Sequence, residues 1–233
     1  MRGGAVRGLE LHLRRMEEAS RELFDEAADA GRIRALIGQA VAAAAGDGDA
    51  SVRVTVVPHE SSTARTDVVV AVSDPVSDAP RPPLWVRTAV YERELPHLKH
   101  VATMGLTHQA RAARKAGYDD VLFLGRDGAV REGSVWNAEF WDGEQVVWPD
   151  APVLPGITMQ LLRAALTRDG VPWTTRVLRT ADLPLLLSAA AVNSHCAAQP
   201  VGRVDGVDLA RDAGALVKVL NSAWAGVAWE PLG

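Results

Sequence analysis

The sequence predicts an α+β fold with antiparallel strands. The turn sequences Gly-Arg-Asp-Gly at 125–128 and Asp142-Gly143 each lie between short apolar runs, a pattern typical of β-hairpins. Stretches with helical spacing of apolar residues lie at both ends of the chain, apart from these hairpins. No Gly-x-Gly-x-x-Gly motif follows a strand, so a doubly wound sheet has no support.

The N-terminal part of the chain passes from helical to strand patterns. Leu9, Leu13 and Met16 begin an apolar stripe at helical spacing, and valine-rich runs follow further along. The proline-rich segment 74–83 predicts a loop before the next strand. The predicted elements of this part are helices over 9–27 and 32–45, and strands over 52–57, 67–72 and 84–91.

The C-terminal part holds the two hairpins and several further helices. Gly117 follows a helical stretch and is the expected C-terminal cap of that helix. The predicted helices cover 107–116, 158–168, 183–187 and 213–225, and the predicted strands cover 121–124, 129–131, 138–141, 145–148, 171–177 and 190–193.

Composition limits the classes of function. With 233 residues, 48% of them hydrophobic, the chain can bury a sizeable core. Its net charge of −4 argues against broad nucleic-acid binding. No apolar run is long enough to cross a membrane, and the start lacks a signal-peptide core. We therefore expect a cytoplasmic protein that binds neither nucleic acid nor a membrane.

Other familiar chemistries lack their motifs. The sequence contains no phosphate-binding Gly-x4-Gly-Lys-Ser/Thr loop and no His-Glu-x-x-His metal motif, so we expect no metal site. Cys196 follows His195, but neighbours on a strand point to opposite faces. We interpret Cys196 as a small buried thiol rather than a nucleophile.

Lys99 is the first candidate for chemistry, because it is one of only three lysines in the chain. A primary amine can lose its proton and attack a carbonyl to form a Schiff base, which a guanidinium cannot do. Lys115 and Lys218 lie on predicted helix faces, where a solvated charge is the simpler interpretation. Lys99 instead follows a predicted strand and Pro96, which would interrupt a helix.

A second group of candidates follows Lys99 within sixty residues. Glu132 ends a predicted hairpin strand, and Asn137 comes five residues later. Gly156, Ile157 and Thr158 open the next helix, where backbone N–H groups and a hydroxyl favour an anion. A lysine amine, a strand-borne carboxylate and a phosphate site are what pyridoxal phosphate requires. Taken singly, the helix start also fits a plain cap and Glu132 an exposed strand end.

The order of these motifs resembles the class IV aminotransferases, the fold-type IV pyridoxal phosphate family. This family includes branched-chain and D-amino acid aminotransferases and aminodeoxychorismate lyase. The resemblance covers most of the chain. The residues that carry it are Lys99, Glu-Gly-x-x-x-Asn at 132–137, Leu-Pro-Gly-Ile-Thr at 154–158, the runs 117–124 and 193–201, Val204-Asp-Gly206, and His12-Leu-Arg-Arg-Met16.

The resemblance implies a role for each matching residue. Lys99 would be the Schiff-base lysine, and Glu132 would pair with the pyridine nitrogen. Asn137 and Gly156 would belong to the cofactor site. The resemblance implies that Arg15, Ile157, Thr158 and Ser194 hold the phosphate, with Ser194 standing where relatives usually have threonine. Arg65 is the candidate ligand of the substrate carboxylate, and Arg87 is the alternative.

The resemblance also implies the architecture and the reaction. We expect a small N-terminal domain at 1–102 that lacks the usual first strand, a larger domain at 103–233, the cofactor between them, and a homodimer. Where relatives often have asparagine after the lysine, this chain has Ala102 and Thr103. The implied reaction is amino transfer from an amino acid to a 2-oxo acid. The alternatives are elimination of pyruvate, as in aminodeoxychorismate lyase, and a non-catalytic relative.

Overall fold

The computed structural model describes residues 1–44, 48–60, 62–77 and 79–232. Its contacts divide the chain into two compact units, Met1–Asp78 with Ala228–Gly233, and Ala79–Val227. Residues 79–102, which the sequence analysis places with the small domain, pack with the second unit. The reason is that the strand β4 (Leu84–Val90) is hydrogen-bonded on both sides to strands of that unit.

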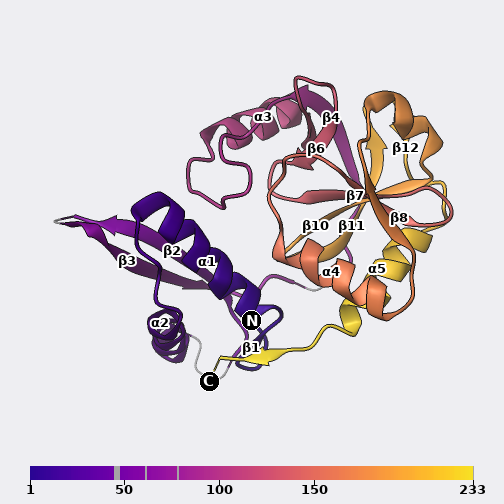
Figure 1. Ribbon diagram of the computed structural model, residues 1–233. Coiled ribbons are helices and arrows are strands. Elements are labelled where there is room, and N and C mark those ends of the chain that lie inside the picture. The colour runs from indigo at the N-terminus through magenta and orange to yellow at the C-terminus, as the bar shows by residue number, and fades with distance from the viewer. Residues whose placement is uncertain (45–47, 61, 78, 233) are drawn as a thin grey trace. The chain divides into compact units, whose positions relative to one another are not determined.

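The first unit packs two helices on a hairpin. The helices α1 (Leu9–Phe24) and α2 (Ala30–Ala44) lie against the antiparallel strands β2 (Ser51–His59) and β3 (Ser62–Ser73) (Figure 1). Apolar residues three or four apart form one face of each helix, as the sequence predicts. The core of the unit includes Leu9, Leu13, Ile33, Ile37 and Val41. The short strands β1 (Ala5–Val6) and β13 (Glu230–Pro231) join the chain ends of this unit.

The second unit is built on a nine-stranded sheet in the described part of the chain. Because β10 pairs with both β11 and β7, six of its strands close into a ring, in the order β4, β5, β6, β7, β10 and β11. The strands that join β4 in the sheet are β5 (Asp120–Leu124), β6 (Val130–Gly133), β7 (Asn137–Trp141), β8 (Val146–Pro149), β9 (Trp173–Arg176), β10 (Ser188–Asn193), β11 (Cys196–Val204) and β12 (Val207–Asp208).

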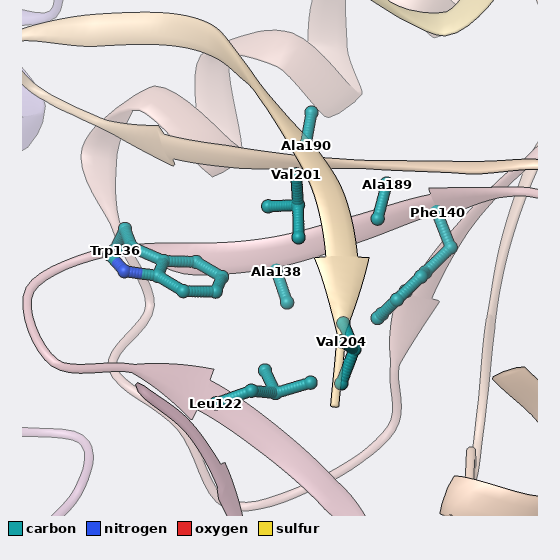
Figure 2. A pocket seen from close by; sticks show the side chains of 8 residues that line it. All are labelled: Leu122, Trp136, Ala138, Phe140, Ala189, Ala190, Val201 and Val204. Atoms are coloured by element: carbon teal, nitrogen blue, oxygen red, sulfur yellow. The ribbon is translucent and has the colours of Figure 1, made fainter. Parts of the chain in front are cut away.

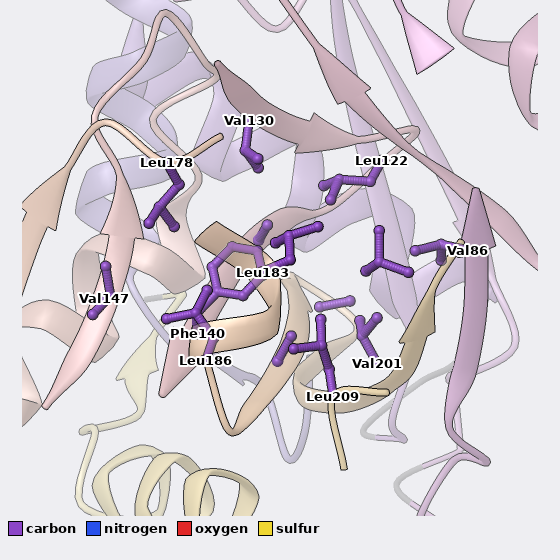
Figure 3. Close-up of a cluster of buried hydrophobic side chains, with 14 of the residues drawn as sticks. Val86, Leu122, Val130, Phe140, Val147, Leu178, Leu183, Leu186, Val201 and Leu209 are labelled. Atoms are coloured by element: carbon purple, nitrogen blue, oxygen red, sulfur yellow. The ribbon is translucent and has the colours of Figure 1, made fainter. Parts of the chain in front are cut away.

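The interior of this ring is a packed core. Figure 2 shows apolar side chains from several strands pointing toward one another, among them Leu122, Trp136, Phe140 and Val201. The gap between them leaves no room for a water molecule. The same core extends outward to Leu178, Leu183 and other residues in Figure 3. The part of the ring interior lined by these residues therefore has no space for a ligand.

Helices cover the outside of the sheet (Figure 1). The helix α3 (Met104–Lys115) packs on β4 and β5, whereas α4 (Ile157–Arg168) and α5 (Ala215–Ala225) pack on β10 and β11 and on each other. A 3-10 helix (Thr180–Leu185) precedes β10. Among the described residues, every helix is too short or too polar to cross a lipid bilayer.

The fold is α+β, and the hairpins at 120–133 and 137–149 form as the turn sequences predict. The structure adds parallel pairs that the sequence analysis does not predict, β4 with β5 and β11, and β8 with β9. Local turn chemistry identifies hairpins, whereas parallel partners are joined by long connections that leave no local signal. The strand β11 carries Gln199, Pro200 and Gly202, which obscure its alternation.

A buried carboxyl group lies beneath α4. Glu139 is fully buried on β7, and neither carboxylate oxygen has a hydrogen-bond partner among the described residues. Burial raises the pKa of Glu139 well above its usual range, although the nearby Arg163 of α4 opposes the shift. The Arg163 guanidinium in turn lies 4.9 Å from the ring centre of Trp148. Burial therefore favours the protonated, neutral form of Glu139 in the folded protein.

This gives a pH-dependent prediction for stability. The folded state keeps the Glu139 proton while the unfolded state releases it, so stability falls as pH rises above the usual glutamate pKa. Each pH unit up to the folded-state pKa costs about 1.4 kcal/mol. We expect Glu139→Gln to raise the melting temperature relative to the parent, by an amount that grows as the pH rises above the usual glutamate pKa. The exposed Glu144→Gln is the matched control, and a gain independent of pH would contradict the prediction.

Candidate functional site

The segment that carries Lys99 is tied to Glu132 by an arginine. Arg93, in the loop after β4, donates from Nη1 to Glu132 Oε1 at 3.3 Å and from Nη2 to the Leu98 carbonyl at 2.5 Å. The Arg93 and Glu132 side chains are 8% and 9% exposed, so the pair is largely shielded from water. Lys99 follows Leu98 directly and is itself exposed. One guanidinium therefore joins the lysine segment to the carboxylate.

Glu132 lies near the end of β6 with both oxygens engaged. Its Oε2 accepts a hydrogen bond from the backbone N–H of Leu154 at 3.1 Å. Burial raises the pKa of Glu132, while the Arg93 charge, the Leu154 N–H and the Lys99 charge act in the opposite direction. Of these opposing influences, the Lys99 charge is the smallest. Each carboxylate oxygen can accept a second hydrogen bond.

Asn137 holds the other side of the same backbone segment. It pairs directly with Glu132 across the β6–β7 hairpin, and its Nδ2 donates to the Leu154 carbonyl at 2.8 Å. Its Oδ1 lies so close to Gly156 that a Cβ at that position would overlap it. Glu132 therefore binds the N–H of Leu154 and Asn137 binds its carbonyl, and together they hold in place the segment that leads into α4.

The N-terminus of α4 follows immediately. Gly156 is the residue before the helix, and no side chain among the described residues caps it. The first N–H groups of a helix have no partners within the helix, so this end favours an anion. Ile157 and Thr158 are buried in the first turn. The structure thus brings Glu132, Asn137, Gly156, Ile157 and Thr158 together around one short segment.

Ser194 lies in the exposed turn between β10 and β11. The Asn193 Oδ1 accepts hydrogen bonds from the N–H groups of His195 and Cys196, which shapes this turn. Val192, two residues before Ser194, pairs with Asn137 on β7, whose side chain contacts Leu154 and Gly156 before α4. This pairing puts the turn at the end of the sheet where α4 begins. Its contact with a phosphate stays a prediction.

The three arginines predicted to bind the phosphate or the substrate carboxylate lie outside the 132–158 segment. Arg87 is half-buried on β4, on the face opposite the fully buried Val86. Arg15 and Arg65 belong to the first unit. Arg15 lies on α1 with its Nη2 3.5 Å from His12 Nδ1, and burial lowers the pKa of Arg15 to about 10. Arg65 is exposed on β3. The roles of these arginines stay predictions.

A cavity of about 270 Å³ lies beside Glu132 in the second unit. One part of its wall is apolar and the other carries the Arg93–Glu132 pair and a second buried arginine, Arg131. The Arg131 charge is matched by Glu92 and Asp127. The lining residues are Tyr91, Glu92, Arg93, Pro96, Phe123, Arg131, Glu132 and Pro152.

Sequence reasoning missed Arg93 and the backbone of Leu154. Arg93 is one arginine among many, and only its hydrogen bonds to Glu132 and Leu98 distinguish it. Its place six residues before Lys99 was the only signal in the sequence. The role of Leu154 lies in its N–H and carbonyl groups, which its side chain does not indicate.

Comparison with known families identifies the group to which this chain belongs. A family model described as amino-transferase class IV matches residues 1–204, which is most of the chain. The chain belongs to the class IV aminotransferase family. A comparison with curated proteins gave no match. Membership accounts for the succession of Lys99, Glu132 and the 154–158 segment, all of which lie within the matched range.

Solved structures share the fold of this member of the class IV aminotransferase family at low sequence identity. A hypothetical aminotransferase from Mycobacterium tuberculosis, solved in a PLP-bound form, is similar with a TM-score of 0.82 and 24% identity, over 95% of this chain and 85% of that one. A branched-chain aminotransferase from Thermoproteus uzoniensis gives 0.85 and 19%, over 98% and 85%. A putative 4-amino-4-deoxychorismate lyase from Legionella pneumophila gives 0.82 and 16%, over 94% and 88%. These likenesses show the fold.

Proposed function

We propose that the protein is a pyridoxal phosphate-dependent aminotransferase that moves an amino group between an amino acid and a 2-oxo acid. The observation that carries the proposal is the linkage of the segment before Lys99, Glu132 and the start of α4 through Arg93 and Leu154. It joins an amine segment, a buried anion and an uncapped helix N-terminus within one unit. Family membership and the PLP-bound form of the Mycobacterium tuberculosis structure support the same conclusion.

The residues present fit this cofactor. Glu132 is held in place by Arg93 and Leu154 and still has lone pairs available for a ring N–H. The helix α4 begins without a side-chain cap, so the N–H groups of its first turn can donate to a phosphate, together with the Thr158 hydroxyl. Asn137 and Gly156 keep this helix start in position.

Each residue then has a defined task. Pyridoxal phosphate, when bound, supplies an aldehyde that captures amines and a ring that accepts electrons from the substrate. Lys99 would supply the amine that holds the aldehyde, and the same amine would be the base that moves a proton at the substrate Cα. Glu132 holds a proton at the ring nitrogen, because an anion at that position favours the protonated ring. Arg93 keeps the Glu132 carboxylate oriented.

The remaining parts of the proposal concern the phosphate, the substrate and assembly. We propose that Arg15 and Ser194 complete the phosphate ligands and that Arg65, or alternatively Arg87, binds the substrate carboxylate. We also propose a homodimer. Leu95, Val101 and Met104, which flank Lys99 in the sequence, expose 46%, 78% and 85% of their surface, and clustered apolar exposure is typical of an interface.

The function is tested with a panel of ¹⁵N-labelled amino acids and unlabelled 2-oxo acids, given to the protein loaded with pyridoxal phosphate. We expect at least one pair in which the label moves to the 2-oxo acid, detected by mass spectrometry as a new labelled amino acid. Release of pyruvate from aminodeoxychorismate without an acceptor would support the lyase instead. A protein that binds the cofactor but transfers no label from any donor would be a non-catalytic relative.

A further inference from the structure

A buried aspartate lies behind the site, on the first residue of β5. Asp120 is 7% exposed and accepts two side-chain hydrogen bonds on Oδ2, from the Ser134 hydroxyl at 2.7 Å and from Trp136 Nε1 at 3.0 Å. Its Oδ1 accepts the N–H of Val121 at 2.9 Å. Ser134 and Trp136 are themselves 5% and 6% exposed, so all three groups are removed from water. Hydrogen bonds to a buried carboxylate are stronger than those between neutral groups.

The two donors belong to the turn that separates the functional strands. Ser134 and Trp136 lie between Glu132 on β6 and Asn137 on β7, and the Gly133 N–H donates to the Trp136 carbonyl at 2.8 Å to close the turn. The Trp136 indole lies against Gly133, where a Cβ would overlap the ring. The same indole fills part of the ring interior in Figure 2. The turn is therefore held from the β5 side by Asp120 and from inside by the indole.

This arrangement controls where the site residues point. Glu132 and Asn137 are the directly paired residues at the mouth of the turn. A tilt of the turn would move both of their side chains relative to Leu154, whose N–H and carbonyl they bind. The side-chain hydrogen bonds of Asp120 reach the two residues indirectly, through Ser134 and Trp136.

We propose that Asp120 is a positioning residue that sets the geometry of Glu132 and Asn137 toward the cofactor. The proposal rests on the proposed function, because Glu132 must face the ring nitrogen for its position to matter. A displacement of about 1 Å at such a group costs on the order of 100-fold in rate. Asp120→Asn keeps the size of the side chain but replaces one acceptor oxygen with a donor and removes the charge.

The readout is the dissociation constant of pyridoxal phosphate, measured by absorption titration, together with kcat and KM. We expect Asp120→Asn to weaken cofactor binding and lower kcat by roughly 10- to 100-fold, with a smaller change in KM. Trp136→Phe, which keeps a ring in the interior and loses the N–H, should give part of the same effect. If the parent protein itself binds no pyridoxal phosphate, the proposed function fails and the Asp120 proposal fails with it. If the parent binds the cofactor and Asp120→Asn binds it equally well, the Asp120 proposal alone is overturned.

Two comparisons distinguish positioning from a general loss of stability. Asp212 is a matched control, because its carboxylate also accepts from a serine hydroxyl, that of Ser188, and from backbone N–H groups of the α5 start. Asp212→Asn should lower the melting temperature and leave the cofactor dissociation constant unchanged. In the Glu132→Ala background, Asp120→Asn should weaken cofactor binding by a smaller factor than in the parent, because only Asn137 is then left to be displaced. Equal weakening in both backgrounds, or by Asp212→Asn as well, would overturn the proposal.

Discussion

Lys99→Ala is expected to abolish amino transfer, lowering the rate on the order of 1,000-fold or more, because it removes both the amine that binds the aldehyde and the base at Cα. The visible absorption of lysine-linked cofactor should be lost. The fold should persist, since Lys99 is exposed and packs in none of the core clusters of the described residues. Circular dichroism and the melting temperature check that point.

The chain also contains two lysines that serve as controls for this result. Its other lysines, Lys115 on α3 and Lys218 on α5, are both exposed on helices. Lys115→Ala should retain full activity and the visible absorption. Borohydride reduction of the loaded protein followed by peptide mass spectrometry should find the cofactor on one peptide, the one that contains Lys99. Attachment at Lys115 or Lys218 would refute the assignment.

Glu132→Gln is expected to lower kcat by roughly 100-fold while the cofactor still attaches to Lys99. A neutral amide does not hold the ring nitrogen in its protonated form, so electron acceptance by the ring weakens. The change also leaves the buried Arg93 guanidinium without an anion, which should cost roughly 1.5–3 kcal/mol of stability. Absorption spectra, steady-state kinetics and thermal unfolding measure the three effects separately.

Glu94→Gln provides the comparison, because Glu94 lies in the same loop as Arg93 and is exposed. It should leave kcat unchanged. It should change the free energy of unfolding, followed by the melting temperature, by no more than about 0.5 kcal/mol. Full activity in Glu132→Gln would remove Glu132 from the proposed chemistry, whatever happened to stability.

Much of the fold could be predicted from local signals. The helices α1 and α2 follow from apolar spacing, and the hairpins at 120–133 and 137–149 follow from Gly-Arg-Asp-Gly and Asp-Gly turns. The closure of the sheet could not be predicted. It depends on β10 pairing with β7 about fifty residues earlier in the chain and on the parallel neighbours of β4, and no turn sequence encodes either.

The candidate site divides in the same way. Lys99, Glu132 and the 154–158 segment could be found because their residue types and order are themselves a chemical pattern. Arg93 and Asp120 could not, because their importance lies in which distant groups they contact. A buried ion pair and a buried hydrogen-bond acceptor leave no periodic mark in a sequence, since arginine and aspartate are most often solvated.

The closed ring of strands has a mechanical consequence for the chemistry. In an open sheet, one strand can slide past its neighbour and find a new set of partners at the free edge. In a closed ring, a register shift between β6 and β7 must be matched by register shifts at the other strand pairs, or the ring no longer closes. Deleting a single residue from either strand should therefore destroy the fold rather than shift the site. Changes of length in the outer loops should leave the distances between the site residues unchanged.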